Sequence, residues 1–199
     1  MNKVLQKGIA LGVIMVLFSV IGYIFWLQEF QYYRQVKPIK EEFKKELGDT
    51  LNITGIKPPA FLHFYDNDCI SSKVNIEHLQ LFVKSPVLKM SYYIVMLHKN
   101  QDTTALRLKY KIPSFVKFVT KGANKLAKNC GVLTTPHAVV VTNSSTLYFS
   151  GNYNSKTGLC TSSNISVSAP ATALLFYKQG IDTPLFPSFL TNPWGCAIE

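Results

Sequence analysis

The N-terminal part of the chain contains one long apolar stretch. Residues 8–27, GIALGVIMVLFSVIGYIFWL, include no charged side chain. A helix of about 20 residues spans ~30 Å, the hydrocarbon thickness of a bilayer. A cleavable signal peptide is the main alternative, but its apolar region would be shorter and would end at a small-x-small site. The pattern therefore predicts an uncleaved transmembrane helix over 8–27, preceded by a short tail at 1–7.

After this stretch, apolar runs of strand length alternate with helical patterns. Residues 28–57 are expected to be a juxtamembrane linker with a short helix in PIKEEFKKEL, 58–180 the folded domain, and 181–199 an ordered but irregular tail. Strands are predicted at 61–65, 91–97, 137–141 and 146–150. Helices are predicted from Ser71 or Ser72 to about Lys84, from Pro113 to about Asn129, and from about Asn164 to Lys178.

This order of elements indicates the fold class. Strands separated by helices favour parallel pairing, and the two last strands are close enough in sequence to form a hairpin. The sequence therefore predicts an α/β domain with a mixed central sheet that is flanked by helices.

Charge excludes few functions by itself. Lys and Arg exceed Asp and Glu by 21 to 11, a formal net charge of +10. One face of the helix predicted over 113–129 would carry four lysines: Lys117, Lys121, Lys125 and Lys128. Such a face could bind anionic lipid or an acidic partner, but a face that is simply solvated is the more common explanation. No nucleic-acid reading motif, phosphate-binding glycine loop or catalytic carboxylate pair stands out, so we expect no nucleic-acid partner.

Cys69 is the first candidate for chemistry. It lies where the first predicted strand gives way to a helix. Backbone N–H groups at a helix start stabilise an anion, so a thiol at this place is shifted toward the thiolate, the nucleophile in disulfide exchange. Asp66 and Asp68 oppose that shift. The alternative interpretation is a small buried cysteine.

Several motifs together resemble the thioredoxin fold. HFYDNDCIS (63–71) reads as a strand, a corner with a cysteine and a helix start, and TTPHAVV (134–140) leads into a later strand. GVLTTP (131–136) is similar to the Gly-Val/Ile-x-x-x-Pro segment of that family. LCTSSN (159–164) and NPWGC (192–196) also resemble motifs of uncharacterised membrane-anchored bacterial thioredoxin-like proteins.

The resemblance covers about residues 58–196 and implies a substrate groove. In the family the proline of this segment is cis and faces the active-site cysteines. The matching residue is Pro136, and Thr135 and His137 flank it. We therefore expect these three residues to bind substrate close to Cys69.

One departure from the family is important. Cys69 is followed by Ile70, Ser71 and Ser72, so the corner lacks the second cysteine that would resolve a mixed disulfide. A hydroxyl cannot replace it, because its pKa is far above that of a thiol. Cys69 is therefore expected to act as a monothiol or with a distant partner cysteine, for which Cys130 is the first choice.

The remaining cysteines suggest a structural bridge. A disulfide between Cys160 and Cys196 would tie the tail to the domain and close a loop of ~35 residues, worth ~3–4 kcal/mol in the chain-entropy model. Such a bond forms in an oxidising compartment and favours a domain outside the cytoplasm. Four independent buried thiols are the alternative.

His137 is expected to lie near Cys69, where it would lower the pKa of the thiol or join it in binding a soft metal. One cysteine and one histidine do not make a metal site, and no spacing resembles a zinc site, so neither metal nor cofactor is expected.

These observations lead to one functional hypothesis and one alternative. The hypothesis is a thioredoxin-like protein held in a bacterial inner membrane, with its domain in the periplasm, that exchanges thiols and disulfides with protein substrates. The alternative is a redox-inactive module of the same fold that binds a partner in an envelope assembly.

Overall fold

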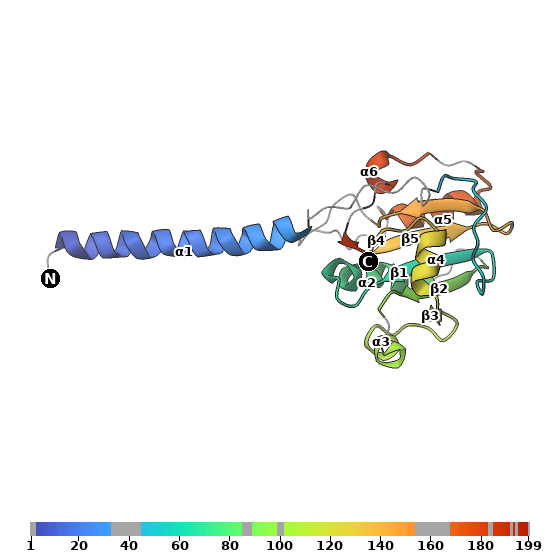
Figure 1. The fold of residues 1–199 in the computed structure, drawn as a ribbon, viewed down its shortest axis with the longest axis horizontal. Helices are drawn as coiled ribbons and strands as arrows, with labels where there is room; N and C mark the ends of the chain where they lie inside the picture. Colours follow the sequence, from blue (N-terminus) through green and yellow to red (C-terminus); the bar gives the residue numbers. More distant parts are fainter. Residues whose placement is uncertain are drawn as a thin grey trace. The chain divides into compact units, whose positions relative to one another are not determined.

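The computed structural model describes residues 3–32, 45–84, 89–98, 102–153, 168–182, 185–191, 193 and 195–198. The chain divides into two compact units, Met1–Gln35 and Val36–Glu199 (Figure 1). The elements of the second unit are β1 (Ala60–Tyr65), α2 (Ile70–Lys84), β2 (Ser91–Met96), α3 (Thr103–Lys109), β3 (Lys117–Val119), α4 (Ala123–Asn129), β4 (Thr134–Thr135), β5 (His137–Val141), β6 (Leu147–Gly151), α5 (Ala169–Lys178), α6 (Ser188–Thr191) and β7 (Cys196–Ala197).

The first unit is a single helix, α1 (Lys3–Tyr32), which contains the predicted span. Among the described residues, it is the one helix that is long and apolar enough to cross a membrane, over Gln6–Leu27. Its large apolar side chains are exposed, as Phe18 at 70% illustrates.

The second unit is built on a five-stranded sheet in the order β3-β2-β1-β5-β6. The strand β1 pairs in parallel with β2 and antiparallel with β5, and β5 and β6 form a hairpin. All six side chains of β1 are buried. A central strand that is covered on both faces has an almost continuous apolar sequence, which explains why AFLHFY lacks the alternation of a half-exposed strand.

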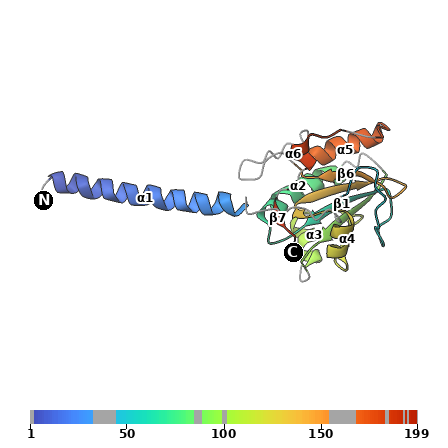
Figure 2. The same ribbon diagram turned by 45° about the horizontal axis from the view of Figure 1, so that its top comes forward.

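Two apolar clusters cover the two faces of this sheet. On one face, α2 and α5 contribute such residues as Leu79 and Leu174. On the other face, α4 contributes Leu126, and the segment ahead of β1 contributes Ile53. Figure 2 shows α5 and α4 on opposite sides of the sheet. The predicted mixed sheet flanked by helices is thus confirmed.

Most predicted elements form close to the expected positions. The strands β1, β2, β5 and β6 and the helix α2 match their predictions within two residues at most boundaries. The last long helix begins at Ala169 with Pro170 in its first turn. The first residues predicted for it, 164–167, lie outside the described part, as does most of the short helix predicted at 38–47.

The helix predicted over 113–129 is wrong. In its place lie a turn, the edge strand β3 and the shorter helix α4. Gly122 is the N-cap of α4 and lies in the left-handed region, with φ of 72°, which a continuous helix does not allow. The predicted lysine face therefore does not exist, because Lys117 belongs to β3 and only Lys125 and Lys128 belong to α4.

The described part of the expected linker also differs from the prediction. Leu51, Ile53 and Ile56 are buried in the cluster beneath α4. Thr50 bridges Thr146 at the hairpin. The folded unit therefore includes residues that the sequence assigns to the linker.

Replacing Leu62 on β1 tests the packing of the central strand. Leu62 is fully buried, so Leu62→Ala removes buried methyl groups and leaves a cavity that lowers the free energy of unfolding by ~2–5 kcal/mol. Leu108→Ala makes the same chemical change at a side chain that is 75% exposed, and should cost less than ~0.5 kcal/mol. Urea unfolding of the detergent-solubilised chain measures both, and equal losses would contradict this assignment of the core.

Candidate active site

Cys69 lies at the corner between β1 and α2, where the sequence predicts it. The main-chain N–H of Cys69 donates to the carbonyl of Asp66 (3.2 Å), and the N–H of Asp68 donates to the Asp66 carboxylate (2.9 Å). Ser72 lies in the first turn of α2 and accepts a hydrogen bond from the N–H of Asp66 (3.3 Å). These bonds hold the corner and place Cys69 immediately before the 15-residue helix α2.

The pairing of β1 with β5 brings a second segment to this corner. In the antiparallel register Phe64 lies opposite His137, so the end of β1 meets the residues that precede β5. The Thr135–Pro136 peptide bond there is cis, as the resemblance implies. The sulfur of Cys69 lies 3.3 Å from the carbonyl oxygen of Thr135.

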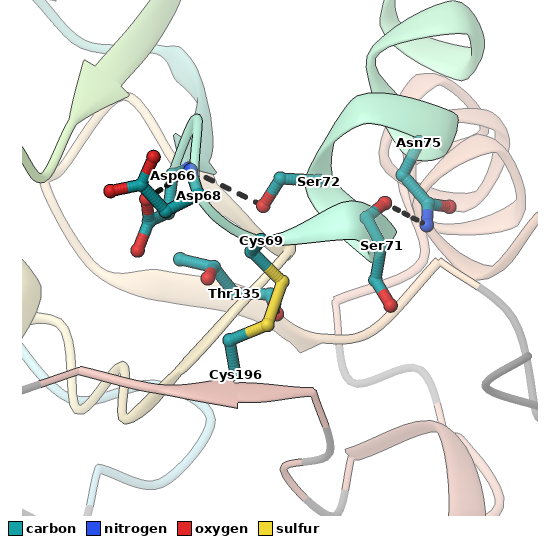
Figure 3. Close-up of a disulfide and its surroundings, with 8 residues drawn as sticks. All are labelled: Asp66, Asp68, Cys69, Ser71, Ser72, Asn75, Thr135 and Cys196. Atoms are coloured by element: carbon teal, nitrogen blue, oxygen red, sulfur yellow. Dashed lines mark hydrogen bonds between the residues drawn. A yellow bond between two sulfur atoms is a disulfide. The ribbon is translucent and has the colours of Figure 1, made fainter. Parts of the chain in front are cut away.

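Cys69 forms a disulfide with Cys196 (Figure 3). The Cα atoms lie 5.9 Å apart, although 127 positions separate the two residues in sequence. The predicted bridge between Cys160 and Cys196 is therefore wrong, because Cys196 has its one bond to Cys69. Cys160 lies outside the described residues.

A small second sheet brings Cys196 to this place. The strand β7 pairs antiparallel with β4, with Thr135 opposite Cys196 and Thr134 opposite Ala197. The N–H of Ile198 donates to the carbonyl of Leu133 (2.8 Å). The end of the expected irregular tail is thus an added strand beside the cis-proline segment.

Cys130 is not the partner of Cys69. It is a free thiol at the end of α4, fully buried in the apolar cluster on that face of the sheet. Burial raises the pKa of the Cys130 thiol to about 12. At neutral pH this group is a protonated thiol in the core, so the resolving role predicted for Cys130 has no support in the geometry.

His137 also differs from its expected role. Its side chain is buried, and its Nε2 lies 2.8 Å from the hydroxyl of Ser150 on β6. Burial lowers the pKa of His137 to about 3. The ring is therefore neutral near pH 7 and does not supply the positive charge that was expected to lower the pKa of the Cys69 thiol.

Another histidine, which the sequence did not single out, lies at the corner. The Nε2 of His98 lies 2.8 Å from the carboxylate of Asp68, and both side chains are more than half exposed. With Asp66 they form a cluster whose possible metal-ligating atoms all lie within 4.8 Å of one another. The sequence does contain a signal for this contact. Asp68 follows β1 and His98 follows β2, and the carboxyl ends of parallel strands lie at the same edge of a sheet.

Polar groups are also buried beneath α2. The Nδ1 of His63 lies 2.5 Å from the hydroxyl of Tyr153, and the ring of His78 lies 5.8 Å from that of Tyr153. Burial, with a smaller effect of the neighbouring His78, lowers the pKa of His63 to about 3. Both histidines are core residues, His63 on the central strand β1 and His78 on α2.

The comparisons with known proteins identify the architecture. No family model and no curated protein matches the sequence. An uncharacterized conserved protein from Geobacillus kaustophilus has a similar structure, with 14% identity, a TM-score of 0.59 and coverage of 78% of this chain and 93% of that one. A hypothetical protein from Sinorhizobium meliloti 1021 matches with 16% identity and a TM-score of 0.56, over 71% and 80%.

The topology of this chain decides its fold class. A parallel β-α-β unit carries a cysteine at its helix start, and a cis-proline precedes the antiparallel hairpin beside it. The fold is thioredoxin-like. StoA from Bacillus subtilis also matches, with 16% identity over 57% of this chain and 89% of its own, at a TM-score of 0.40.

The buried histidines predict a loss of stability in mild acid. In the unfolded chain they take up protons below about pH 6.5, whereas in the folded chain His63 and His137 stay neutral down to about pH 3. The unfolded state therefore binds more protons in this window, and the free energy of unfolding falls as pH is lowered from 6.5. The limiting slope is about 1.4 kcal/mol per pH unit for each histidine.

Urea unfolding at pH 7, 6 and 5 measures this slope. His137→Gln removes one of the two groups and should reduce the dependence on pH in this window. An unchanged slope in His137→Gln would show that the folded protein does not hold this ring neutral.

Proposed function

We propose that this protein is a membrane-anchored thiol–disulfide exchange protein whose redox pair is Cys69 and Cys196. One observation carries the proposal: the cysteine at the start of α2 is bonded to a cysteine on β7, beside the cis-proline segment. The sequence left Cys69 as a monothiol or with a distant partner. Cys196 is that partner, and the protein acts with two thiols.

The helix start explains why Cys69 is the nucleophile. The helix α2 has 15 residues, and its unpaired N–H groups and dipole stabilise negative charge at its first turn. His137 is neutral, and the carboxylate of Asp68 faces His98. The shift toward the thiolate therefore comes from the backbone of α2.

The exchange reaction balances with these two cysteines. In the reduced protein the Cys69 thiolate attacks one sulfur of a substrate disulfide, forms a mixed disulfide and releases the other substrate sulfur as a thiolate. The Cys196 thiolate then attacks Cys69, restores the Cys69–Cys196 bond and releases the second substrate thiolate. The substrate gains two electrons, the protein loses two, and a dithiol donor returns the protein to its reduced form.

The helix α1 is proposed to anchor the chain in a bacterial inner membrane with the domain in the periplasm. Its apolar side chains are exposed along the segment Gln6–Leu27 and need a lipid environment. A disulfide within the domain fits an oxidising compartment better than the cytoplasm.

The burial of Cys69 favours a second candidate function. Cys69 is only 1% exposed in the oxidised protein, where its sulfur is bonded to Cys196 of β7. In this alternative the disulfide is structural, and the domain is a redox-inactive binding module. The experiments on the cysteines below distinguish the two functions.

Thiol chemistry tests the assigned pair. In Cys196→Ser, alkylation of Cys69 should show a pH midpoint below the ~8.5 of a free cysteine, because the start of α2 stabilises the thiolate. The same variant should accumulate a mixed disulfide with a disulfide substrate, which mass spectrometry detects, whereas the wild-type protein resolves it.

Two further variants serve as controls. Cys69→Ser should abolish dithiothreitol-dependent reduction of a fluorogenic disulfide substrate, and Cys130→Ala should retain wild-type turnover, because its thiol is buried away from the reaction. A Cys69–Cys196 bond that dithiothreitol reduces only in the unfolded chain would contradict catalysis and support the binding module.

Membrane extraction tests the anchor. The chain should stay in the membrane pellet through alkaline carbonate washing. Two lysines introduced by Val16→Lys and Phe18→Lys should release it, because each charge at the centre of a span costs ~2.5–3.5 kcal/mol on the insertion scale. An impermeant maleimide should label Cys69 of Cys196→Ser in intact spheroplasts, and labelling that appears only after the spheroplasts are lysed would place the domain in the cytoplasm.

A further inference from the structure

We propose that the C-terminal segment Gly195–Ile198 occupies the docking site of the substrate and stands in for it. The site is the edge of β4 that β7 covers in the oxidised protein. Its ligand is an extended peptide with glycine directly before the reacting cysteine and an apolar residue two positions after it. This inference rests on the proposed thiol–disulfide exchange and specifies its substrate class.

Backbone pairing provides the first argument. Within the described residues β4 pairs only with β7, in a two-stranded sheet of its own. When β7 leaves, Leu133 loses the hydrogen bond that its carbonyl accepts from Ile198, and the edge of Thr134 and Thr135 is uncovered. Uncovered strand edges bind extended peptides by adding them as a further strand.

The disulfide shows where the reacting sulfur of such a peptide lies. Cys196 lies opposite Thr135 in the register, and its sulfur is bonded to Cys69 (Figure 3). A mixed disulfide between Cys69 and a substrate cysteine in the same register has the same local structure. The oxidised protein therefore contains the geometry of its own covalent intermediate.

The residue before the cysteine has to be glycine. Gly195 has φ of 119°, a conformation that residues with a side chain rarely adopt. A Cβ atom built on Gly195 would lie 2.2 Å from the carbonyl oxygen of Thr135. Both the conformation and the close approach exclude a larger residue at this position.

The residue two positions after the cysteine contributes apolar contact. Ile198 is partly buried against the cluster beneath α4. Its N–H is also the donor to Leu133. One residue thus supplies both a side-chain contact and a backbone bond to the docked segment.

The segment Gly195–Ile198 and the substrate cannot occupy the edge of β4 at the same time, so docking of the substrate depends on the redox state of the protein. Two paired residues are too short a strand to be stable alone, so the segment depends on its bond to Cys69. Reduction by a dithiol donor breaks that bond and frees the edge of β4. After a substrate has formed its mixed disulfide with Cys69, attack by Cys196 restores the bond, and the returning tail displaces the product.

Peptide selectivity in the full-length Cys196→Ser protein tests the proposal. The probe is the peptide PWGCAI, with the sequence of residues 193–198, activated as a mixed disulfide with thionitrobenzoate. The thiolate of Cys69 attacks the peptide sulfur and releases the coloured thionitrobenzoate, so absorbance gives the second-order rate. PWVCAI should react at least ~10-fold more slowly, because valine clashes with Thr135.

A backbone-modified peptide separates docking from side-chain size. PWGCAI methylated at the isoleucine nitrogen keeps every side chain but cannot donate to Leu133, and should also react at least ~10-fold more slowly. The rates of all three peptides with free cysteine provide the chemical reference.

The outcomes distinguish a failure of the docking site from a failure of the proposed thiol–disulfide exchange. Fast reaction of Cys69 with all three peptides at equal rates would overturn the docking site and leave thiol exchange intact. Reaction no faster than that of free cysteine with every peptide would overturn the proposed function itself. In the double variant with Cys69→Ser and Cys196→Ser, which leaves neither thiol of the pair free, the release of thionitrobenzoate that depends on the peptide sequence should be absent.

Discussion

The complete burial of β1 is the constraint on which the site depends. Its six residues lie between two helical layers, so no charged group fits along the strand, and acidic residues follow only where it ends. The same strand pairs with β2 on one side and β5 on the other. These pairings bring the corner with Cys69 and the segment with Pro136 to one end of the sheet.

The C-terminal strand β7 contributes the second cysteine that is missing from the corner at Cys69. Ser72 stands where a thioredoxin-like corner would have its second cysteine. Cys196, 127 positions later in the sequence, forms the disulfide with Cys69 instead. In the structure β7 pairs with β4 through only two residues while Cys196 is bonded to Cys69. In the proposed cycle, oxidation closes the edge of β4 and reduction opens it.

The electrostatic character of the domain follows from burial more than from the net charge. His63 and His137 are uncharged in the core, and the Cys130 thiol remains protonated there. In the proposed mechanism the charge that matters is that of the Cys69 thiolate, at the start of α2, where N–H groups of the helix favour it. This separation explains why, of the two described cysteines outside β7, Cys69 is the candidate nucleophile and Cys130 is inert.

The sequence by itself determined the apolar span of α1, the strands β1, β2, β5 and β6, and the cysteine at the start of α2, because local patterning and turn chemistry decide such features. It missed the break between β3 and α4, where Gly122 adopts a left-handed conformation within a sequence of otherwise helical pattern. Only the tertiary structure decided the partner of Cys69. A disulfide requires two Cα atoms within about 7 Å, and no local pattern encodes a contact across 127 positions that depends on the pairing of β4 with β7.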